Sequence, residues 1–278
     1  MNTGFLTIYW REMIRFVRFR AQLFSSLVQP ALWLGFFGVA MSSSFQQLES
    51  VDAAAGGVPV GYLTFMAAGV IALTTLFTSL FGGIGLLFDR NWGLMREIMA
   101  SPMPRTHLVV GMGLSGMTKS FIQSGVILLF GLLLGVEFFT GSAGILQTAA
   151  AVLGVFAFVG IFSLGFLFLS SAISLRMESP EGLQGVITLL TMPLFFVSNA
   201  LYPVDAFPPA LQTLSAANPL THLVSGIRYF AIGPDFTAIG VHYVYTPGMV
   251  LLSFGVLLGF AALMFMIAWQ TVRTAVVT

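Results

Sequence analysis

Residues 138–175 read FFTGSAGILQTAAAVLGVFAFVGIFSLGFLFLSSAISL and contain no Asp, Glu, Lys or Arg. A helix needs roughly 20 apolar residues to cross the hydrocarbon core of a bilayer, so this run is long enough for a membrane span. The whole chain of 278 residues is 57% hydrophobic and 8% charged. Soluble domains carry about a quarter of their residues as charged types, so the sequence predicts an all-α membrane protein.

Five further uncharged runs lie on either side of this one. They are Ala21–Phe45, Ala53–Phe88, Ser120–Val136, Gly182–Tyr202 and Thr246–Val272. Together the six runs predict six transmembrane helices in one transmembrane domain, residues 1–278. Residues 206–227 are also uncharged, but prolines and asparagine interrupt them, and such breakers are typical of short helices rather than of a full crossing. We therefore expect a short re-entrant helical hairpin over residues 203–232, before the last span.

Basic residues indicate the orientation of the chain. If the N-terminus is cytoplasmic, ten Lys and Arg residues fall in inner segments and only Arg228 falls in an outer one. Cytoplasmic loops carry the excess of Lys and Arg, so both termini are expected in the cytoplasm of a multi-pass protein of the cell (inner or cytoplasmic) membrane.

The first basic segment, residues 4–20, has an amphipathic pattern. Arg11, Arg15 and Arg18 fall within about 60° of one another at 100° per residue, and aromatic and apolar residues cluster on the opposite side. The pattern predicts an interfacial helix whose arginines face lipid phosphates or an acidic partner. A simple surface anchor and a gate helix that contacts a partner protein both fit it.

The sequence offers little for catalysis, metal binding or ion coupling. It has no cysteine, and His107, His222 and His242 lack the spacing of metal ligands. The charged residues close to the spans, Lys119 and Glu137, have no expected buried partner, which argues against an ion-coupled carrier. We expect no enzyme, no metal site and no nucleic-acid partner.

The chain is also not expected to bind ATP. A phosphate-binding P-loop requires glycine directly before lysine, and the only lysine, Lys119, follows Thr118. If transport is active, the ATPase is therefore a separate subunit.

Charge concentrates in residues 88–107, which include the segment DRNWGLMREIMASPMPRTH beginning at Asp89. Trp92–Ala100 is predicted to form a short helix, because the prolines that follow remove donors and restrict the preceding residues. Such a helix could serve as a docking element for a motor protein, although an ordinary solvated loop fits the sequence equally well. The candidate residues are Arg90, Gly93, Arg96, Glu97, Ser101, Pro102 and Arg105.

Two motifs resemble those of type-two ABC exporter permeases, the membrane subunits of one class of ABC transporters. The first is Gly93-x-x-x-Glu97-x-x-x-Ser101-Pro102. The second runs from Ser198-Asn199-Ala200-Leu201-Tyr202-Pro203 through Phe207-Pro208 and Asn218-Pro219 to Gly226-Ile227-Arg228-Tyr229. Each motif is loose, but their order and spacing extend the resemblance over essentially the whole chain.

The resemblance implies a set of partners and site roles. Two permease chains, most simply a homodimer, would form the pathway in the lipid membrane, and two ABC ATPase subunits would bind below and use ATP and Mg. Glu97 and its neighbours would dock on an ATPase, with Arg11, Arg15 and Arg18 beside that contact. The hairpin would contribute to an outer gate, or would only cap the spans. The outer-gate candidates are Pro203, Pro208, Asn218, Pro219 and Arg228.

Composition gives a weak indication of the substrate. The chain has 28 Phe, which favours a drug-like or lipid-like amphiphile, whereas a polysaccharide or glycolipid path would be expected to use Tyr and Trp, of which there are 6 and 4. The prediction is thus an exporter of amphiphiles, with a polysaccharide or glycolipid exporter as the alternative. A second, more distant alternative is an ATP-independent carrier or channel.

Overall fold

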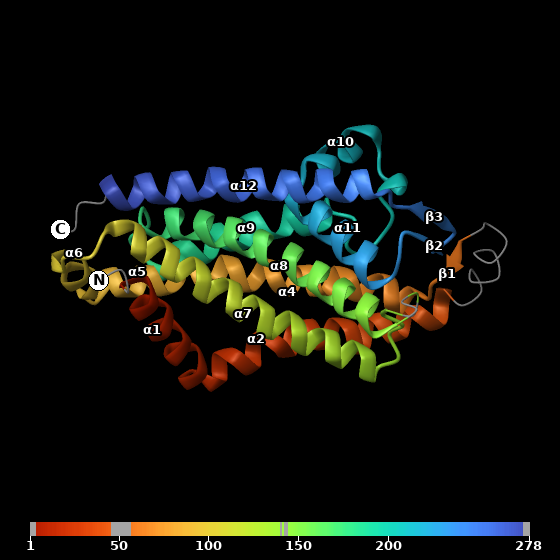
Figure 1. Cartoon of the computed structure of the whole chain (residues 1–278), viewed down its shortest axis with the longest axis horizontal. Coiled ribbons are helices and arrows are strands. Elements are labelled where there is room, and N and C mark those ends of the chain that lie inside the picture. Colours follow the sequence, from red (N-terminus) through yellow and green to blue (C-terminus); the bar gives the residue numbers. More distant parts are fainter. Residues whose placement is uncertain (1–3, 46–56, 140, 142–143, 275–278) are drawn as a thin grey trace.

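The computed structural model describes residues 4–45, 57–139, 141 and 144–274. Residues 53–56 of the second predicted span lie outside the described residues. The helices run along one long axis (Figure 1), and the beginning of α1 (Gly4–Arg18), the short helix α6 (Leu94–Ala100) and the end of α12 (Pro247–Thr274) lie at the same end of the molecule. We call this end the α6 end.

Five helical segments of the described chain are long and apolar enough to cross a membrane. Three of them are single helices: α7 (Arg105–Leu133), α8 (Ile145–Ser174) and α12. The segment Ser26–Phe45 contains most of α2 (Arg20–Leu32) and the π-helical turn η1 (Trp33–Gly38). The segment Tyr62–Asn91 contains α4 (Tyr62–Gly82) and α5 (Ile84–Asn91). The helix α8 packs against α4, α7, α11 (Pro219–Ala231) and α12, and much of its surface is buried. The class predicted from the sequence, a helical membrane protein, is confirmed.

The count of six spans is not confirmed. The run Gly182–Tyr202 forms α9 (Pro180–Phe196), which has 17 residues and contains Pro193. At 1.5 Å per residue it is about 26 Å long, slightly short of the hydrocarbon core. Hydrogen bonds nevertheless place Met177 beside Arg90 at the α6 end and Asn199 beside Arg228 and the start of α4. The chain therefore passes along the long axis through α9, and its role as a sixth span stays a prediction.

Three short strands at the opposite end were not predicted. The strand β1 (Val58–Pro59) pairs in parallel with β2 (Asp235–Ala238), and β2 pairs antiparallel with β3 (Val241–Val244). Phe236 is buried between the strands and the start of α4, with its ring 5.2 Å from that of Tyr243. We call this end the sheet end (Figure 1). The pairing of β1 with β2 therefore holds the segment that precedes α4 against the segment that precedes α12 at this end of the molecule.

The segment predicted as a re-entrant hairpin consists of a 3-10 turn, η2 (Val204–Ala206), and two short helices, α10 (Pro209–Ala217) and α11. That it re-enters the membrane stays a prediction. Prolines begin both helices, as expected where the first backbone donors have no helical partner. Between them, Asn218 Oδ1 accepts a hydrogen bond from the backbone N–H of Leu220 at 2.9 Å, and Asn218 Nδ2 donates to the carbonyl of Leu194 at 2.7 Å. Asn218 thus caps α11 and attaches the hairpin to α9.

Candidate functional site: a buried charge network beside an exposed helix

Two carboxylates are buried near the α6 end. Asp89 on α5 is 0% exposed and Glu12 on α1 is 3% exposed. Arg11 Nη2 donates to Asp89 Oδ2 at 2.6 Å, and Arg15 Nη2 donates to Asp89 Oδ1 at 2.8 Å. Glu12 Oε2 accepts from Lys119 Nζ on α7 at 3.1 Å, and its other oxygen accepts from both arginines. We call these five residues the charge network; it joins three helices.

The charge network is favourable only while it is complete. Burial opposes ionisation of Glu12, but the positive charges of Lys119, Arg15 and Arg11 outweigh it and hold the pKa of the carboxyl below its usual value of 4.5. Because the folded-state pKa is lowered, the stability that ionised Glu12 contributes is present above its unfolded pKa and is lost as pH falls through the folded one. Removing one partner of such a buried pair typically costs about 3–5 kcal/mol.

The close packing of α1 on α7 positions the network. A Cβ atom at Gly111 would lie 2.6 Å from the carbonyl oxygen of Phe5 and 2.8 Å from Cβ of Ile8, so only glycine allows this approach. Ile8 is buried against α7 in the same contact. The amphipathic helix predicted for residues 4–20 ends at Arg18. Because of its contact with α7, it buries part of one face in the protein.

Sequence reasoning missed most of this network. Lys119 was expected to have no buried partner, and this expectation is wrong, because Glu12 pairs with it. Arg11 and Arg15 turn toward Asp89, and among the three predicted arginines only Arg18 is exposed. The signal that could have found the network is the pair of acidic residues, Glu12 and Asp89, each placed beside arginines at the edge of an apolar run.

The loop of residues 88–107 contains the predicted short helix. It begins at Leu94 rather than at Trp92, because Gly93 has a φ of 80°, a left-handed conformation that favours glycine. It ends at Ala100, as predicted, because the following residue, Ser101, has extended backbone; the Ser101 hydroxyl donates to the carbonyl of Ile98 at 2.6 Å. The glycine and the Ser101-Pro102 pair of the motif thus delimit α6.

Two of the predicted arginines hold this loop to the helical body. Arg90 Nη1 donates to the carbonyls of Leu175 and Met177 at 2.8 and 3.2 Å, beyond the end of α8. Arg105 Nη1 donates to the carbonyl of Arg273 at 2.7 Å, in the last turn of α12. Both arginines satisfy carbonyls at helix C-termini, where cations are favoured.

The remaining charged residues of α6 face outward. Met95, 1% exposed, anchors the helix in a cluster of buried side chains that includes Leu86 and Leu108. Arg96 and Glu97 are exposed and have no ion pair in the part of the chain that the structure describes. The helix is therefore a fixed platform with an arginine and a carboxylate available to a partner.

The other predicted residues belong to the hairpin, whose helices α10 and α11 lie in the half of the molecule nearer the sheet end (Figure 1). Pro203 and Asn218 are buried, Pro219 is half-buried and Pro208 is exposed. Arg228 was predicted in an outer segment, but it is 0% exposed, because its guanidinium stacks 3.6 Å from the centre of the Phe65 ring and donates to the carbonyl of Asn199 at 2.8 Å. These contacts join the hairpin to α4. The two sets of candidates are thus at opposite ends of the molecule.

Comparison with known proteins gives consistent matches. The family described as ABC-2 type transporter matches residues 3–232. The transport permease ycf38 of Cyanophora paradoxa is 29% identical over 220 residues, which cover 79% of this chain and 71% of the relative. The daunorubicin resistance ABC transporter permease protein DrrB1 of Streptomyces coeruleorubidus is 25% identical, over 88% of this chain and 81% of the relative. The inner membrane transport permease YadH of Escherichia coli is 23% identical, over 96% and 93%.

Proposed function

Because this chain belongs to the ABC-2 type transporter family and is a membrane transport permease, we propose that it is the permease of an ATP-driven exporter of amphipathic, drug-like or lipid-like substrates. The observation that carries the proposal is α6, a short helix fixed at both sides by Arg90 and Arg105 and exposing Arg96 and Glu97. A separate ABC ATPase, using ATP and Mg, would dock on this helix. A second copy of the chain would complete the pathway.

The charge network offers a route by which a displacement of α6, caused by the ATPase, would reach the membrane spans. Asp89 lies on α5, three residues before Trp92, where the turn through Gly93 into α6 begins. A displacement of α6 by the ATPase would therefore move Asp89, and its ion pairs would pull α1 along. Glu12 would pass the movement to Lys119 on the span α7. In this mechanism Arg11 and Arg15 do not bind the ATPase themselves. They lie beside the ATPase contact and transmit the movement through their ion pairs with Asp89 inside the permease.

Two observations support the substrate class. One relative is named for resistance to daunorubicin, and this name describes the relative and not the present chain. In this chain, phenylalanine rings pack along α8 and its neighbours, for example Phe158 with Phe254 at 5.3 Å between ring centres and Phe166 with Phe260 at 4.9 Å. Such an apolar, aromatic interior is compatible with an amphiphile moving through or along the spans.

Purification with native partners tests the proposal. We expect an ABC ATPase to copurify with the chain, and a hydrophobic amphiphile to stimulate its ATP turnover. The chain purified without partners should bind no nucleotide, since it has no GK[ST] sequence. Export that continues without any ATPase would contradict the proposal and would favour a carrier.

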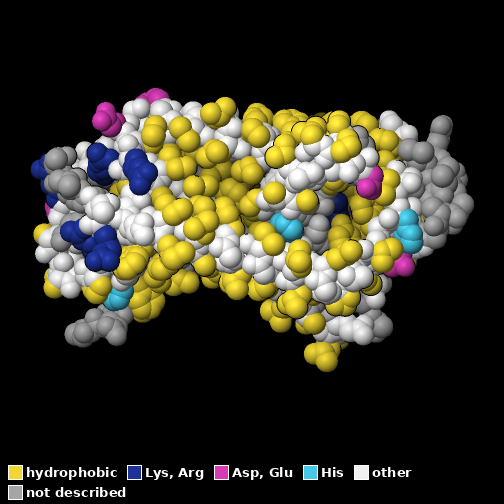
Figure 2. All heavy atoms as spheres, turned by 90° about the horizontal axis from the view of Figure 1, so that it is seen from above, with side chains coloured by type: hydrophobic (Ala, Val, Ile, Leu, Met, Phe, Trp, Pro, Cys, Tyr) yellow, Lys and Arg dark blue, Asp and Glu magenta, His cyan; other side chains and the backbone are white. Residues whose placement is uncertain are grey.

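The orientation is a separate prediction. Figure 2 shows Lys and Arg side chains gathered at the α6 end, so we expect this end, with both termini, to be cytoplasmic. Reporters fused after Pro102 and Glu178 should report the cytoplasm, and reporters fused after Asp205 and Gly240 should report the exterior. The result at Glu178 and Asp205 tests α9 directly, because the two sites flank it. The same side for both would refute six crossings.

A further inference from the structure

A cavity of about 410 Å³ lies between α11 and the first turns of α12. Its lining includes His222, Ser225, Tyr245, Met249, Leu252 and Ser253. Ligand sites typically measure about 300–1,000 Å³ and are mainly apolar with a few placed polar groups. We call this cavity the α11–α12 pocket. Figure 2 shows the face that carries α12 hollowed beside a histidine, with hydrophobic side chains around the hollow.

The pocket opens on an exposed apolar surface of α12. Met249 and Leu252 line it and are 56% and 64% exposed, and the neighbouring Leu251 is 73% exposed. All three belong to α12, which is long and apolar enough to cross a membrane, so we expect these exposed apolar side chains to face the bilayer. A molecule that enters the pocket from this side therefore comes from the membrane.

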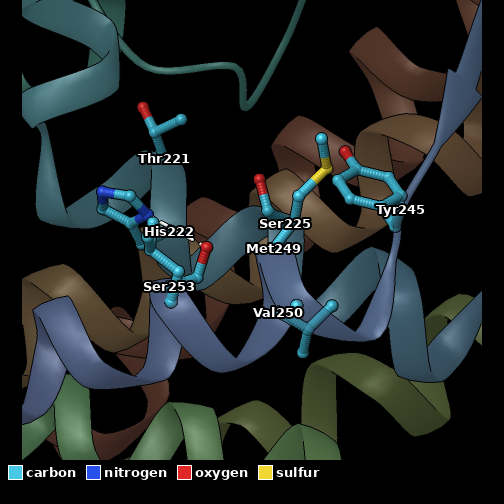
Figure 3. Close-up of a pocket in the computed structure, with 9 residues that line it drawn as sticks. Thr221, His222, Ser225, Tyr245, Met249, Val250 and Ser253 are labelled. Carbon is cyan, nitrogen blue, oxygen red and sulfur yellow. Dashed lines mark hydrogen bonds between the residues drawn. The ribbon is translucent and has the colours of Figure 1, made fainter.

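Several polar groups of the pocket are already satisfied. His222 Nε2 is 3.0 Å from the carbonyl of Ala216 and must donate to it, so Nδ1 of the neutral ring accepts from the hydroxyl of Ser253, also at 3.0 Å. Burial lowers the pKa of His222, which favours this neutral form. Figure 3 shows the bond between the two side chains at one side of the pocket.

Two hydroxyl donors remain unused. Ser225 Oγ accepts from Asn199 Nδ2 at 3.2 Å, and its own proton has no acceptor among the described residues. The Tyr245 hydroxyl likewise makes no hydrogen bond within the described chain. Figure 3 shows both side chains in the pocket, with Met249 between them in that view. Hydroxyl groups that line an apolar pocket and can still donate favour an occupant that brings an acceptor.

Among the described residues, no charged side chain lines the pocket. A phosphate or ammonium group would be placed there without a counter-charge, which is unfavourable in a medium of low polarity. The fitting acceptor is therefore an uncharged oxygen, attached to a chain that lies on Met249 and Leu252. We propose that the α11–α12 pocket binds an uncharged, ester-bearing lipid of the bilayer, with Ser225 and Tyr245 donating to an ester carbonyl.

The test uses the full chain in nanodiscs of neutral lipid, without ATP, so its outcome is independent of the export proposal. The probe is a photoreactive diacylglycerol, and labelled peptides are identified by mass spectrometry. We expect saturable labelling of the segment around Met249, competed by unlabelled diacylglycerol. A photoreactive alkane of equal length should label this segment weakly, because it has no acceptor.

One substitution fills the pocket without disturbing the fold. Gly248 lines the pocket, and a Cβ atom there would meet only Thr246 Oγ1, at 3.9 Å. Gly248→Leu should therefore reduce labelling at least about tenfold, whereas the matched control Gly255→Leu, on the exposed face of the same helix with open space around it, should label like wild type.

The donors are tested separately. Ser225→Ala combined with Tyr245→Phe should weaken diacylglycerol binding by about fivefold to thirtyfold, because each hydrogen bond contributes about 1 kcal/mol. Alkane labelling should not change in this variant. Equal labelling of wild type and Gly248→Leu, or equal labelling by the diacylglycerol and the alkane, would overturn the proposal.

Discussion

Replacing Asp89 by Asn should destabilise the folded chain by about 3 kcal/mol, the loss expected when one partner of a buried ion pair is removed. The substitution keeps the shape of the side chain but removes the charge that Arg11 and Arg15 share at 2.6 and 2.8 Å. Asp89 is 0% exposed, so water does not replace it. In detergent, the midpoint of thermal unfolding should fall by about 6–12 °C.

The control for this measurement is Asp205→Asn. Asp205 is exposed and has no ion pair within the described residues, so its midpoint should change little. The loss caused by Asp89→Asn should be smaller in a background that carries Arg11→Gln and Arg15→Gln, because the two guanidinium groups that lose the Asp89 carboxylate are then absent. Equal midpoints for the two Asp→Asn variants would show that the charge network does not stabilise α1 on the body of the protein.

The main helices follow from the sequence because their cause is local. Uncharged runs of sufficient length predict membrane helices, and α8 and α12 lie within such runs, 138–175 and 246–272, apart from the last two residues of α12. Gly93 and the Ser101-Pro102 pair likewise set the limits of α6 through their own backbone preferences. The family resemblance rests on the same local signals, and the family is confirmed over residues 3–232.

The contacts between distant segments could not be predicted in this way. Arg15 and Asp89 are 74 residues apart, and Lys119 and Glu12 are 107 apart. Nothing in a hydropathy pattern indicates that these residues meet, because the pattern gives the length of a helix and not its neighbour. For the same reason the sequence placed Arg228 in an outer segment but did not indicate that its side chain is buried against Phe65.

The sheet was missed because its strands are too short to show a pattern. The strand β1 has two residues, and β2 and β3 have four each, which only reaches the lower limit of the about four to eight residues over which alternation is recognised. Its stability depends on Phe236, Tyr243 and Phe65, whose rings lie 5.2 and 5.5 Å apart. Phe236 and Tyr243 face each other across the β2–β3 pairing, whereas Phe65 comes from the distant start of α4.

Glu97→Ala should leave the permease folded and inserted, but should weaken ATPase binding by about thirtyfold or more. In the proposed complex, the exposed carboxylate pairs with a cation of the ATPase and is shielded from water. Truncating one partner of a buried interfacial pair costs about 2–5 kcal/mol, and each 1.4 kcal/mol corresponds to about a tenfold change in affinity. In the free permease Glu97 has no ion pair in the described residues, so the thermal midpoint should not change.

The experiment expresses each variant with the cognate ATPase and measures recovery of the complex, ATP turnover and export together. Glu178→Ala is the matched control, since Glu178 is also exposed and follows α8, whose end is held by Arg90 at the α6 end. Arg96→Lys should have a milder effect than Glu97→Ala, because it keeps the charge beside the carboxylate. If Glu97→Ala matches Glu178→Ala in all three measurements, the ATPase does not dock through this carboxylate. The assignment of α6 as the coupling helix would then lose its main support.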